Sequence, residues 1–249
     1  MSAPAKRAWY VACYYLSWGW FAAVALALNA ACVPLLLLPG RSGAGIRVRK
    51  AIRFLFQLWR SWFHACGVLR VTWEGFDRRL PSGTIYIANH PTLLDATLIL
   101  SKLPDAICVM KPSLMRNFAI APAAIMAGYV VSGKPIDTVR EAAARVAAGS
   151  SLLIFPEGTR TPLGAILGPV KPGFFLGAQR ARAPIQLIVI RASPGLVPKG
   201  RSWWRPPRAL PAWITFTLDR RWEWHAQRSS DQVIAELELR VESVLKGPG

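Results

Sequence analysis

Acidic side chains are scarce in this chain, and their scarcity restricts the partners that it can bind. Asp and Glu number 13 against 31 Lys and Arg, which gives a formal net charge of +18 over 249 residues. Residues 1–73 and 158–218 each contain nine basic residues and no acid. Charge segregated in this way indicates an anionic partner, either a nucleic acid or an anionic membrane surface. Tryptophan and arginine are interspersed through residues 201–224, as at a lipid headgroup boundary, so we expect a lipid bilayer as partner and no nucleic acid. The alternative for this segment is a solvated basic loop beside core tryptophans.

Cysteines are few, and a serine-nucleophile motif is missing. The spacing of the four cysteines matches no metal-binding or redox motif: Cys13, Cys32, Cys66 and Cys108. Because two of them lie in an apolar N-terminal run, we expect no disulfide framework, no metal site and a reducing cytoplasm. The chain also lacks a G-x-S-x-G sequence, so a serine nucleophile of that kind is not predicted.

Charged residues are absent from residues 8–40. The run is too long for a signal peptide, and no convincing cleavage site follows it. As a helix, residues 21–38 would measure about 27 Å, close to the ~30 Å hydrocarbon thickness of a bilayer. The run could form one span, or a hairpin in one leaflet with its turn near Gly19 or Asn29. More basic residues follow the run than precede it, which predicts that the rest of the chain is cytoplasmic.

Residues 46–66 have the pattern of an amphipathic helix. Basic and polar residues recur every three or four positions along one face: Arg49, Arg53, Gln57, Arg60 and His64. Large apolar residues occupy the other face. Such a helix either lies in the membrane interface or packs on a globular core with its basic face solvated.

From residue 68 onward, strand and helix patterns alternate. Strands are predicted over 69–73, 84–88, 107–110, 152–155, 185–190 and 213–217. Helices are predicted over 93–103, 116–127, 138–148 and 173–182, the third with Asp137 as N-cap and Gly149 as its stop, and an acid-rich amphipathic helix over 231–245. This alternation predicts an α/β fold with a central sheet flanked by helices.

Two short motifs each follow a predicted strand. The segment 89–95 (NHPTLLD) contains His90, whose unperturbed pKa of about 6.5 suits a general base. With Pro91 at the first helical position, Asp95 falls on the first turns of a helix, from which its carboxylate could orient the imidazole. In the segment 155–160 (FPEGTR), Gly158 permits a sharp turn and Arg160 presents a fork of donors that suits a phosphate.

The H-x4-D spacing of His90 and Asp95, followed by FPEGTR, resembles the motifs of the glycerolipid acyltransferases, whose best-known members acylate lysophosphatidic acid. The likeness extends from about residue 62 to about residue 191. The resemblance implies that His90 and Asp95 are catalytic and that Arg160 binds a phosphate of the acceptor. It also places three further residues in the acceptor site: Glu157, Gly158 and Thr159.

Two other segments resemble family motifs less closely. Residues 128–134 (GYVVSGK) occupy the place of a motif that usually ends in Arg, and Lys134 stands at that position. Lysine keeps the charge but loses bidentate geometry, which leaves the identity of the acceptor open. Lys171 precedes a predicted helix and resembles a basic position of the family. A lysine at a helix N-terminus is a natural anion site, although an ordinary helix start has the same pattern.

The resemblance implies a membrane-bound O-acyltransferase, with residues 1–66 as membrane anchor and residues 67–249 as catalytic domain. It would transfer a fatty acyl group from acyl-CoA or acyl carrier protein to the hydroxyl of a lysophospholipid, with lysophosphatidate as first choice. The thioester is a substrate, so no cofactor is expected. We expect a bacterial inner-membrane location with the catalytic domain on the cytoplasmic side. The uncharged stretch 118–132 would line the acyl-chain entrance or form an ordinary buried helix.

Two alternatives to this function remain open. The same chemistry could act on another lipid acceptor, such as an aminolipid, a glycolipid or a polyene lipid. The chain could also be a non-catalytic lipid-binding membrane protein that has kept the fold.

Overall fold

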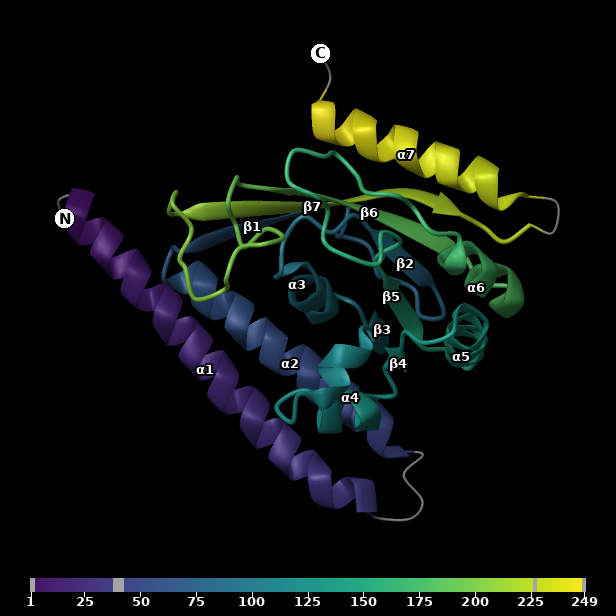
Figure 1. Ribbon diagram of the computed structural model, residues 1–249, viewed down its shortest axis with the longest axis horizontal. Helices are drawn as coiled ribbons and strands as arrows, with labels where there is room; N and C mark the ends of the chain where they lie inside the picture. Colours follow the sequence, from purple (N-terminus) through teal and green to yellow (C-terminus); the bar gives the residue numbers. More distant parts are fainter. Residues whose placement is uncertain (1–2, 38–42, 226–227, 248–249) are drawn as a thin grey trace.

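A computed structural model describes residues 3–37, 43–225 and 228–247 (Figure 1). The elements in chain order are α1 (Ala3–Leu37), α2 (Ala44–Ala65), β1 (Leu69–Glu74), β2 (Ile85–Ala88), α3 (Asp95–Lys102), β3 (Ala106–Met110), the 3-10 helix η2 (Pro112–Arg116), α4 (Ala121–Ala127), β4 (Val130–Val131), α5 (Pro135–Ala147), β5 (Ser151–Ile154), α6 (Gly173–Ala181), β6 (Ile185–Ala192), β7 (Ala212–Trp222) and α7 (Ser230–Lys246).

A seven-stranded sheet forms the centre of the molecule, in the order β1-β7-β6-β2-β5-β3-β4. Strands β6, β2, β5, β3 and β4 are parallel, whereas β7 runs antiparallel to β6 and β1 runs parallel to β7. This mixed sheet confirms the predicted α/β class. Because the carboxyl ends of parallel strands meet at one edge, the segments that follow β2, β5, β3 and β4 lie along the same edge, where α/β folds bind ligands.

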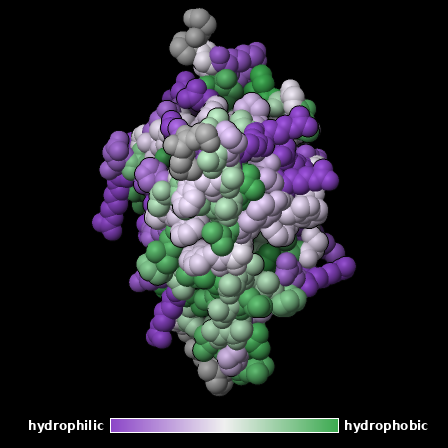
Figure 2. Space-filling model, turned by 90° about the vertical axis from the view of Figure 1, so that its left-hand side faces the viewer, coloured by the Kyte–Doolittle hydropathy of each residue, from purple (hydrophilic) through white to green (hydrophobic). Residues whose placement is uncertain are grey.

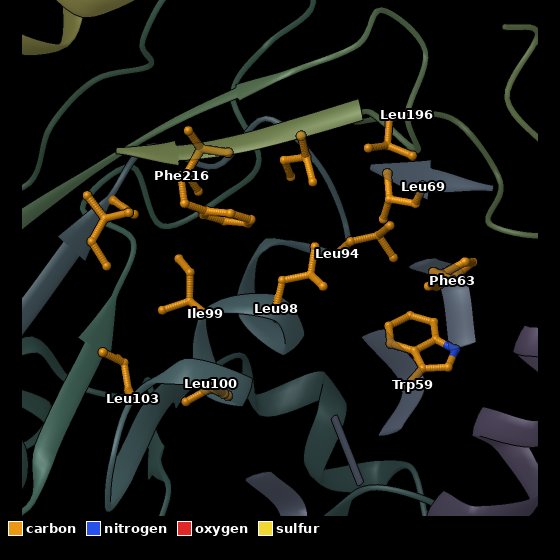
Figure 3. Packing of buried hydrophobic residues seen from close by; sticks show 14 of the residues in the cluster. Trp59, Phe63, Leu69, Leu94, Leu98, Ile99, Leu100, Leu103, Leu196 and Phe216 are labelled. Carbon is orange, nitrogen blue, oxygen red and sulfur yellow. The ribbon is translucent and has the colours of Figure 1, made fainter. Parts of the chain in front are cut away.

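Helices cover both faces of the sheet (Figure 1). Ile85 and Ile87 of β2 pack in one cluster with α5, α6 and α7. Tyr86 and Ala88 point the other way, into a cluster with α2 and α3. Both faces are therefore buried, which explains why the central strands are continuous apolar runs in the sequence. Figure 3 shows α3 within the second cluster, with Leu98 between Phe216 of β7 and Trp59 of α2.

Helix α1 is continuous over 35 residues, about 52 Å at the α-helical rise. The alternative of a hairpin with its turn near Gly19 or Asn29 is therefore wrong, because the helix continues through both positions. Instead α1 and α2 lie side by side and run in opposite directions (Figure 1). By length and composition α1 could cross a membrane, and only 11% of its most apolar window is buried within the protein. Figure 2 shows hydrophobic atoms over the lower half of the face that α1 presents.

The polar face of α2 packs against the sheet domain. Arg49 donates to the carbonyl of Ala127 at the end of α4, and Gln57 donates to the carbonyl of Ser101 in the last turn of α3. Carbonyls at a helix C-terminus lack partners within the helix, so these side chains satisfy them and complement the helix dipole. On the other side of α2, Trp59 and Phe63 are buried in the shared core. The helix thus packs on the globular core, with part of its polar face bonded rather than solvated, and it also exposes Phe54, Leu58 and Trp62, as a helix in the membrane interface would.

Several predicted boundaries differ from the structure. The helix predicted over 116–127 is shorter than expected: α4 begins at Ala121, Pro122 lies in its first turn, and Arg116 ends the preceding η2. Helix α5 begins at Pro135, so Asp137 is not its N-cap but a first-turn residue, because proline is pre-organised for the first helical position. Helix α3 begins at Asp95, so Pro91 does not occupy its first position. The short strand β4 was not predicted.

Candidate active site

The two sequence motifs meet because β2 and β5 are neighbours in the sheet. Ile87 of β2 pairs with Ile154 of β5, so the residues that follow the two strands leave the sheet side by side. Asn89 fixes the exit of the first motif. Its buried side chain donates to the carbonyl of Ile190 in β6 at 2.9 Å and accepts from the N–H of the same residue at 2.7 Å. His90 therefore leaves the sheet edge from a backbone that is held on both sides.

His90 and Asp95 form the hydrogen-bonded pair that their spacing predicts. Nδ1 of His90 lies 2.8 Å from Oδ2 of Asp95, whose side chain is 0% exposed, whereas that of His90 is 17% exposed. Thr92 completes the surroundings of the carboxylate. Its N–H donates to Oδ2 at 2.8 Å and its hydroxyl donates to Oδ1 at 2.5 Å. Since a carboxylate only accepts hydrogen bonds, the neutral imidazole carries its proton on Nδ1, which leaves Nε2 as a proton acceptor.

The ring of Phe155 stacks on the imidazole, with 4.0 Å between ring centroids and 17° between planes. This contact restricts rotation of the ring, and the bond to Asp95 fixes which edge of the imidazole faces inward. Phe155, Thr92 and Asn89 were not predicted as site residues, although all three lie within the two motifs. The sequence signal that could have identified them as site residues was their position within the two motifs.

Glu157 turns away from solvent and toward the backbone of His90. It is 4% exposed. Oε1 accepts from the N–H of His90 at 2.9 Å and from the hydroxyl of Thr161 at 2.8 Å, and Oε2 accepts from the N–H of Gly168 at 2.7 Å. Thr161 also donates its N–H to the carbonyl of His90 at 2.8 Å. A Cβ on Gly168 would lie 2.6 Å from Oε2, so any other residue there would displace this carboxylate. The carboxylate thus joins three chain segments.

Arg160 and Lys171 lie beside the same turn. Nη1 of Arg160 donates to the carbonyls of Val197 and Pro198 at 3.2 and 2.9 Å, and its other guanidinium nitrogens form no hydrogen bond with the described residues. Gly158 has a φ of +67°, and a Cβ there would lie 3.2 Å from Nζ of Lys171. Two basic groups therefore lie at this turn, Arg160 within the hexapeptide and Lys171 beside it, and Thr159 between Gly158 and Arg160 is half-buried.

Val197 has a backbone conformation that a β-branched residue rarely adopts. Its φ is +43°, and a proline follows it, which disfavours this conformation further. Its carbonyl accepts from the N–H of Leu93, within the first motif, and from Arg160, within the second. Strain of this kind costs about 1–3 kcal/mol and persists only where surrounding contacts fix it. The carbonyl of Val197 therefore joins the two motifs by hydrogen bonds. No signal in the sequence predicted this contact.

Lys134 is exposed and directly precedes α5, beyond the end of β4. It lies on the same edge as His90 but three strand positions away, roughly 14 Å at the usual strand spacing. The structure thus brings five of the other predicted site residues together around His90 and Asp95 and places Lys134 farther along the edge. Among the described residues, no group of three or more His, Cys, Asp or Glu side chains could hold a metal ion.

An apolar cavity of about 250 Å³ lies between α1, α2, α3 and α4. A water molecule needs only about 10–15 Å³ by the same measure, so this cavity could hold a much larger ligand. Its wall contains Trp20, Phe21, Val24, Ala25, Leu28, Asn29, Ile52, Leu55, Phe56, Ala96, Thr97, Leu100, Cys108, Met110, Leu114, Ala119, Ile120, Ala123, Ala124 and Tyr129. Burial raises the pKa of Cys108 to about 12 and raises that of Tyr129 as well, so both groups stay neutral. The uncharged stretch 118–132 supplies five of these residues.

Helix α3 connects the sheet edge that carries His90 with the apolar cavity. It begins with Asp95, and its following residues Ala96, Thr97 and Leu100 line the cavity. An apolar chain in this cavity would therefore end near the residues that orient His90.

Residues 70–191 match a family model described as Acyltransferase. The match covers just under half of the chain and supports the resemblance to the glycerolipid acyltransferases that the two motifs indicate. The matched segment contains His90, Asp95 and the hexapeptide, together with Lys134 and Lys171.

Two curated relatives carry names of the same kind. The chain is 28% identical over 159 residues to the chloroplastic 1-acyl-sn-glycerol-3-phosphate acyltransferase BAT2 of Brassica napus, and 34% identical over 113 residues to a 1-acyl-sn-glycerol-3-phosphate acyltransferase of Cocos nucifera. The matches cover 61% and 43% of this chain but only 46% and 36% of those proteins. The chain thus aligns with less than half the length of these relatives.

The fold is that of a solved structure, the 1-acyl-sn-glycerophosphate (LPA) acyltransferase PlsC from Thermotoga maritima. The TM-score is 0.68 and the sequence identity 19%, and the match covers 99% of this chain and 98% of the solved one. The correspondence therefore includes the N-terminal helices as well as the sheet domain.

Proposed function

We propose that this chain is a membrane-bound O-acyltransferase. It transfers a fatty acyl group from an acyl thioester, either acyl-CoA or acyl carrier protein, to the hydroxyl of a lysophospholipid, with lysophosphatidate as the first-choice acceptor. The observation that carries the proposal is the 2.8 Å contact between His90 and Asp95 beside the hexapeptide. The printed names of the relatives support the choice of acceptor.

In the proposed mechanism, Nε2 of His90 takes the proton of the acceptor hydroxyl as its oxygen attacks the thioester carbonyl. The new C–O bond gives a tetrahedral intermediate, and the imidazolium is stabilised by the buried carboxylate of Asp95. Collapse of the intermediate breaks the C–S bond, and the imidazolium returns the proton to the departing thiolate. The products are an ester and a free thiol, and the enzyme forms no covalent intermediate.

Arg160 and Lys171 provide the positive charge for an acceptor phosphate. Arg160 is held by one nitrogen, so the rest of its fork can bind phosphate oxygens. Lys171 approaches the same turn at Gly158. Glu157 is assigned a different task from acceptor binding, because its carboxylate is buried and bonded to three protein donors. It holds His90 in place.

The apolar cavity holds the acyl chain in this proposal. Its wall is almost entirely hydrocarbon, and each methylene group buried there contributes about 0.8 kcal/mol. The exposed apolar face of α1 would lie in the lipid, which places the cavity near the source of lipid substrates. Because basic residues follow the apolar run in excess, we assign the sheet domain to the cytoplasmic side.

The test is transfer by purified protein, measured with labelled acyl thioesters, a panel of lysolipids and mass detection of products. His90→Ala should lower kcat at least about 10³-fold, the scale expected when a general base is lost. His225→Ala is the matched control, because His225 follows β7, which runs antiparallel to β6 and ends at the opposite edge. Full activity in His90→Ala, or no product with any lysolipid, would overturn the proposal. The second outcome would favour a non-catalytic lipid-binding protein.

A second candidate keeps the chemistry and changes the acceptor. Its support is the segment 132–134, in which Ser132, Gly133 and Lys134 replace the usual family residues at the far end of the binding edge. An aminolipid, a glycolipid or a polyene lipid in the acceptor panel would identify this case. The product spectrum decides between the two acceptors.

A further inference from the structure

Asn29 is a buried amide in the middle of the long apolar helix α1, where residues 8–40 carry no charge. It is 4% exposed. An unpaired amide in apolar surroundings costs several kcal/mol, so a residue of this kind is retained only where it has partners. The partners of Asn29 show what it does.

The amide of Asn29 connects α1 to α4. Oδ1 accepts from the N–H of Ala123 at 2.8 Å, and Nδ2 donates to the carbonyl of Ala119 at 2.7 Å. Nδ2 also donates to the carbonyl of Ala25, one turn earlier in α1. Asn29 thus accepts one hydrogen bond from α4 and donates one to the segment that directly precedes it. Both partners lie at least 90 residues farther along the chain.

The start of α4 is held by the carbonyl of Asn117, which accepts from the N–H groups of Ile120 and Ala121 at 3.0 and 2.8 Å, and by Asn29. Its N-cap, Ile120, supplies no side-chain hydrogen bond, and Pro122 has no N–H. The N–H of Ala123 therefore depends on Asn29. At seven residues, α4 is also too short to be stable alone. At its other end Arg49 of α2 donates to the carbonyl of Ala127 and pairs with Asp105 at 2.7 Å.

Both walls that Asn29 joins belong to the apolar cavity. Ala25 and Leu28 of α1 line it on one side, and Ala119 and Ala123 line it on the other, with Asn29 itself between them. The hydrogen bonds of His90 and Asp95, in contrast, involve no residue of α1 or α4. The position of α4 can therefore change the cavity without changing the pair.

We propose that Asn29 is a positioning residue that sets the distance between α1 and α4 and thereby the preference of the enzyme for acyl-chain length. This inference rests on the proposed function, because it assigns the cavity to the acyl chain of the thioester. Without the amide, α4 shifts, and the distal part of a long acyl chain loses contacts that a short chain never makes.

The test compares thioesters of four and sixteen carbons with the full-length protein in detergent or nanodiscs. For Asn29→Ala, kcat/KM for the sixteen-carbon donor should fall about tenfold, the loss expected when roughly two methylene groups lose their contacts. For the four-carbon donor it should stay within about twofold. The matched control is Leu26→Ala, since Leu26 lies on the same helix and is 47% exposed. It should leave both values unchanged.

Two further variants make the result decisive. If Asn29→Ala does not fold, Asn29→Ser keeps a small polar group in α1 but is too short for both bonds to α4, and it should show the same length-dependent loss. Arg49→Gln weakens the contact at the C-terminal end of α4. It should also lower kcat/KM more for the sixteen-carbon donor than for the four-carbon donor. An equal loss for both donors, or no loss for either, would overturn the role of Asn29. Failure of the wild-type protein to transfer any acyl group would instead overturn the proposed function.

Discussion

The polar edge around His90 and the apolar cavity between α1 and α4 share helix α3 but are built in different ways. At the polar edge, the residues come from two short segments that directly follow neighbouring strands. Their polar groups are bonded to one another, as in the contacts of Glu157 with His90, Thr161 and Gly168. The cavity wall comes from four α-helices, the 3-10 helix η2, strand β3 and connecting segments, spread from Trp20 to Tyr129.

The two regions therefore respond differently to substitution. In a closed network of buried hydrogen bonds, the loss of one partner leaves another polar group unsatisfied, so effects are large and abrupt. In an apolar cavity, contacts are many and individually weak, so effects are graded with the volume that is added or removed. The predictions below test this contrast, beginning with the largest effect.

Asp95→Asn should lower kcat about 10³- to 10⁴-fold while the acceptor KM stays nearly constant. An amide can accept from Thr92 at one end, but its NH2 group then faces Nδ1 of His90. The imidazole would move its proton to Nε2 and could no longer act as a base. Asp231→Asn, at an exposed position of α7, is the control. A loss of less than tenfold in Asp95→Asn, with thermal stability unchanged, would contradict the assigned role of the pair.

Glu157→Gln should lower kcat/KM about 10²-fold and reduce the free energy of unfolding by about 1–3 kcal/mol. Glutamine has one acceptor oxygen, so its NH2 group must face either the N–H of His90 or the N–H of Gly168. Thermal unfolding and steady-state kinetics together check this. If only the acceptor KM rises and thermal stability is unchanged, Glu157 contacts the acceptor, as the family resemblance implies. The hydrogen bonds within the protein would then not occupy its carboxylate fully.

Much of the polar edge could be predicted from the sequence, because its geometry follows from local rules. His90 and Asp95 are close together in the chain, and parallel strands bring the hexapeptide to the same edge. The inward orientation of Glu157 could not be predicted, since it depends on Gly168, eleven residues later. Val197 was also missed, because its left-handed conformation before a proline is one that local preferences disfavour.

The cavity could be predicted only in part. The uncharged stretch 118–132 was expected to line an acyl-chain entrance, and it supplies part of the wall. The role of Asn29 was hidden, because a polar residue in an apolar run is also typical of a turn. Its partners are Ala119, which precedes α4, and Ala123, in the first turn of α4, and the contact of Ala123 is tertiary, so local sequence does not reveal it.

Arg160→Ala should raise the acceptor KM about tenfold to thirtyfold, with little change in the thioester KM. The carbonyls of Val197 and Pro198 hold this guanidinium in a fixed position. Arg160→Lys should recover only part of the loss, because lysine lacks the fork. Arg180→Ala, at an exposed position of α6, is the matched control. An unchanged acceptor KM in Arg160→Ala would remove Arg160 from the phosphate site.

Ala124→Leu should produce the smallest and most graded effect. Ala124 is 4% exposed and lines the cavity from α4, so the added carbon atoms occupy space that an acyl chain would otherwise fill. The preferred chain should shorten by about two carbons, and kcat/KM should fall about fourfold for each methylene group that no longer fits. Four-carbon donors should be used as before. Ala144→Leu, at an exposed position of α5, should change neither profile. A uniform loss across all chain lengths in Ala124→Leu would mean that the cavity and the polar edge are coupled, which would remove the contrast between them.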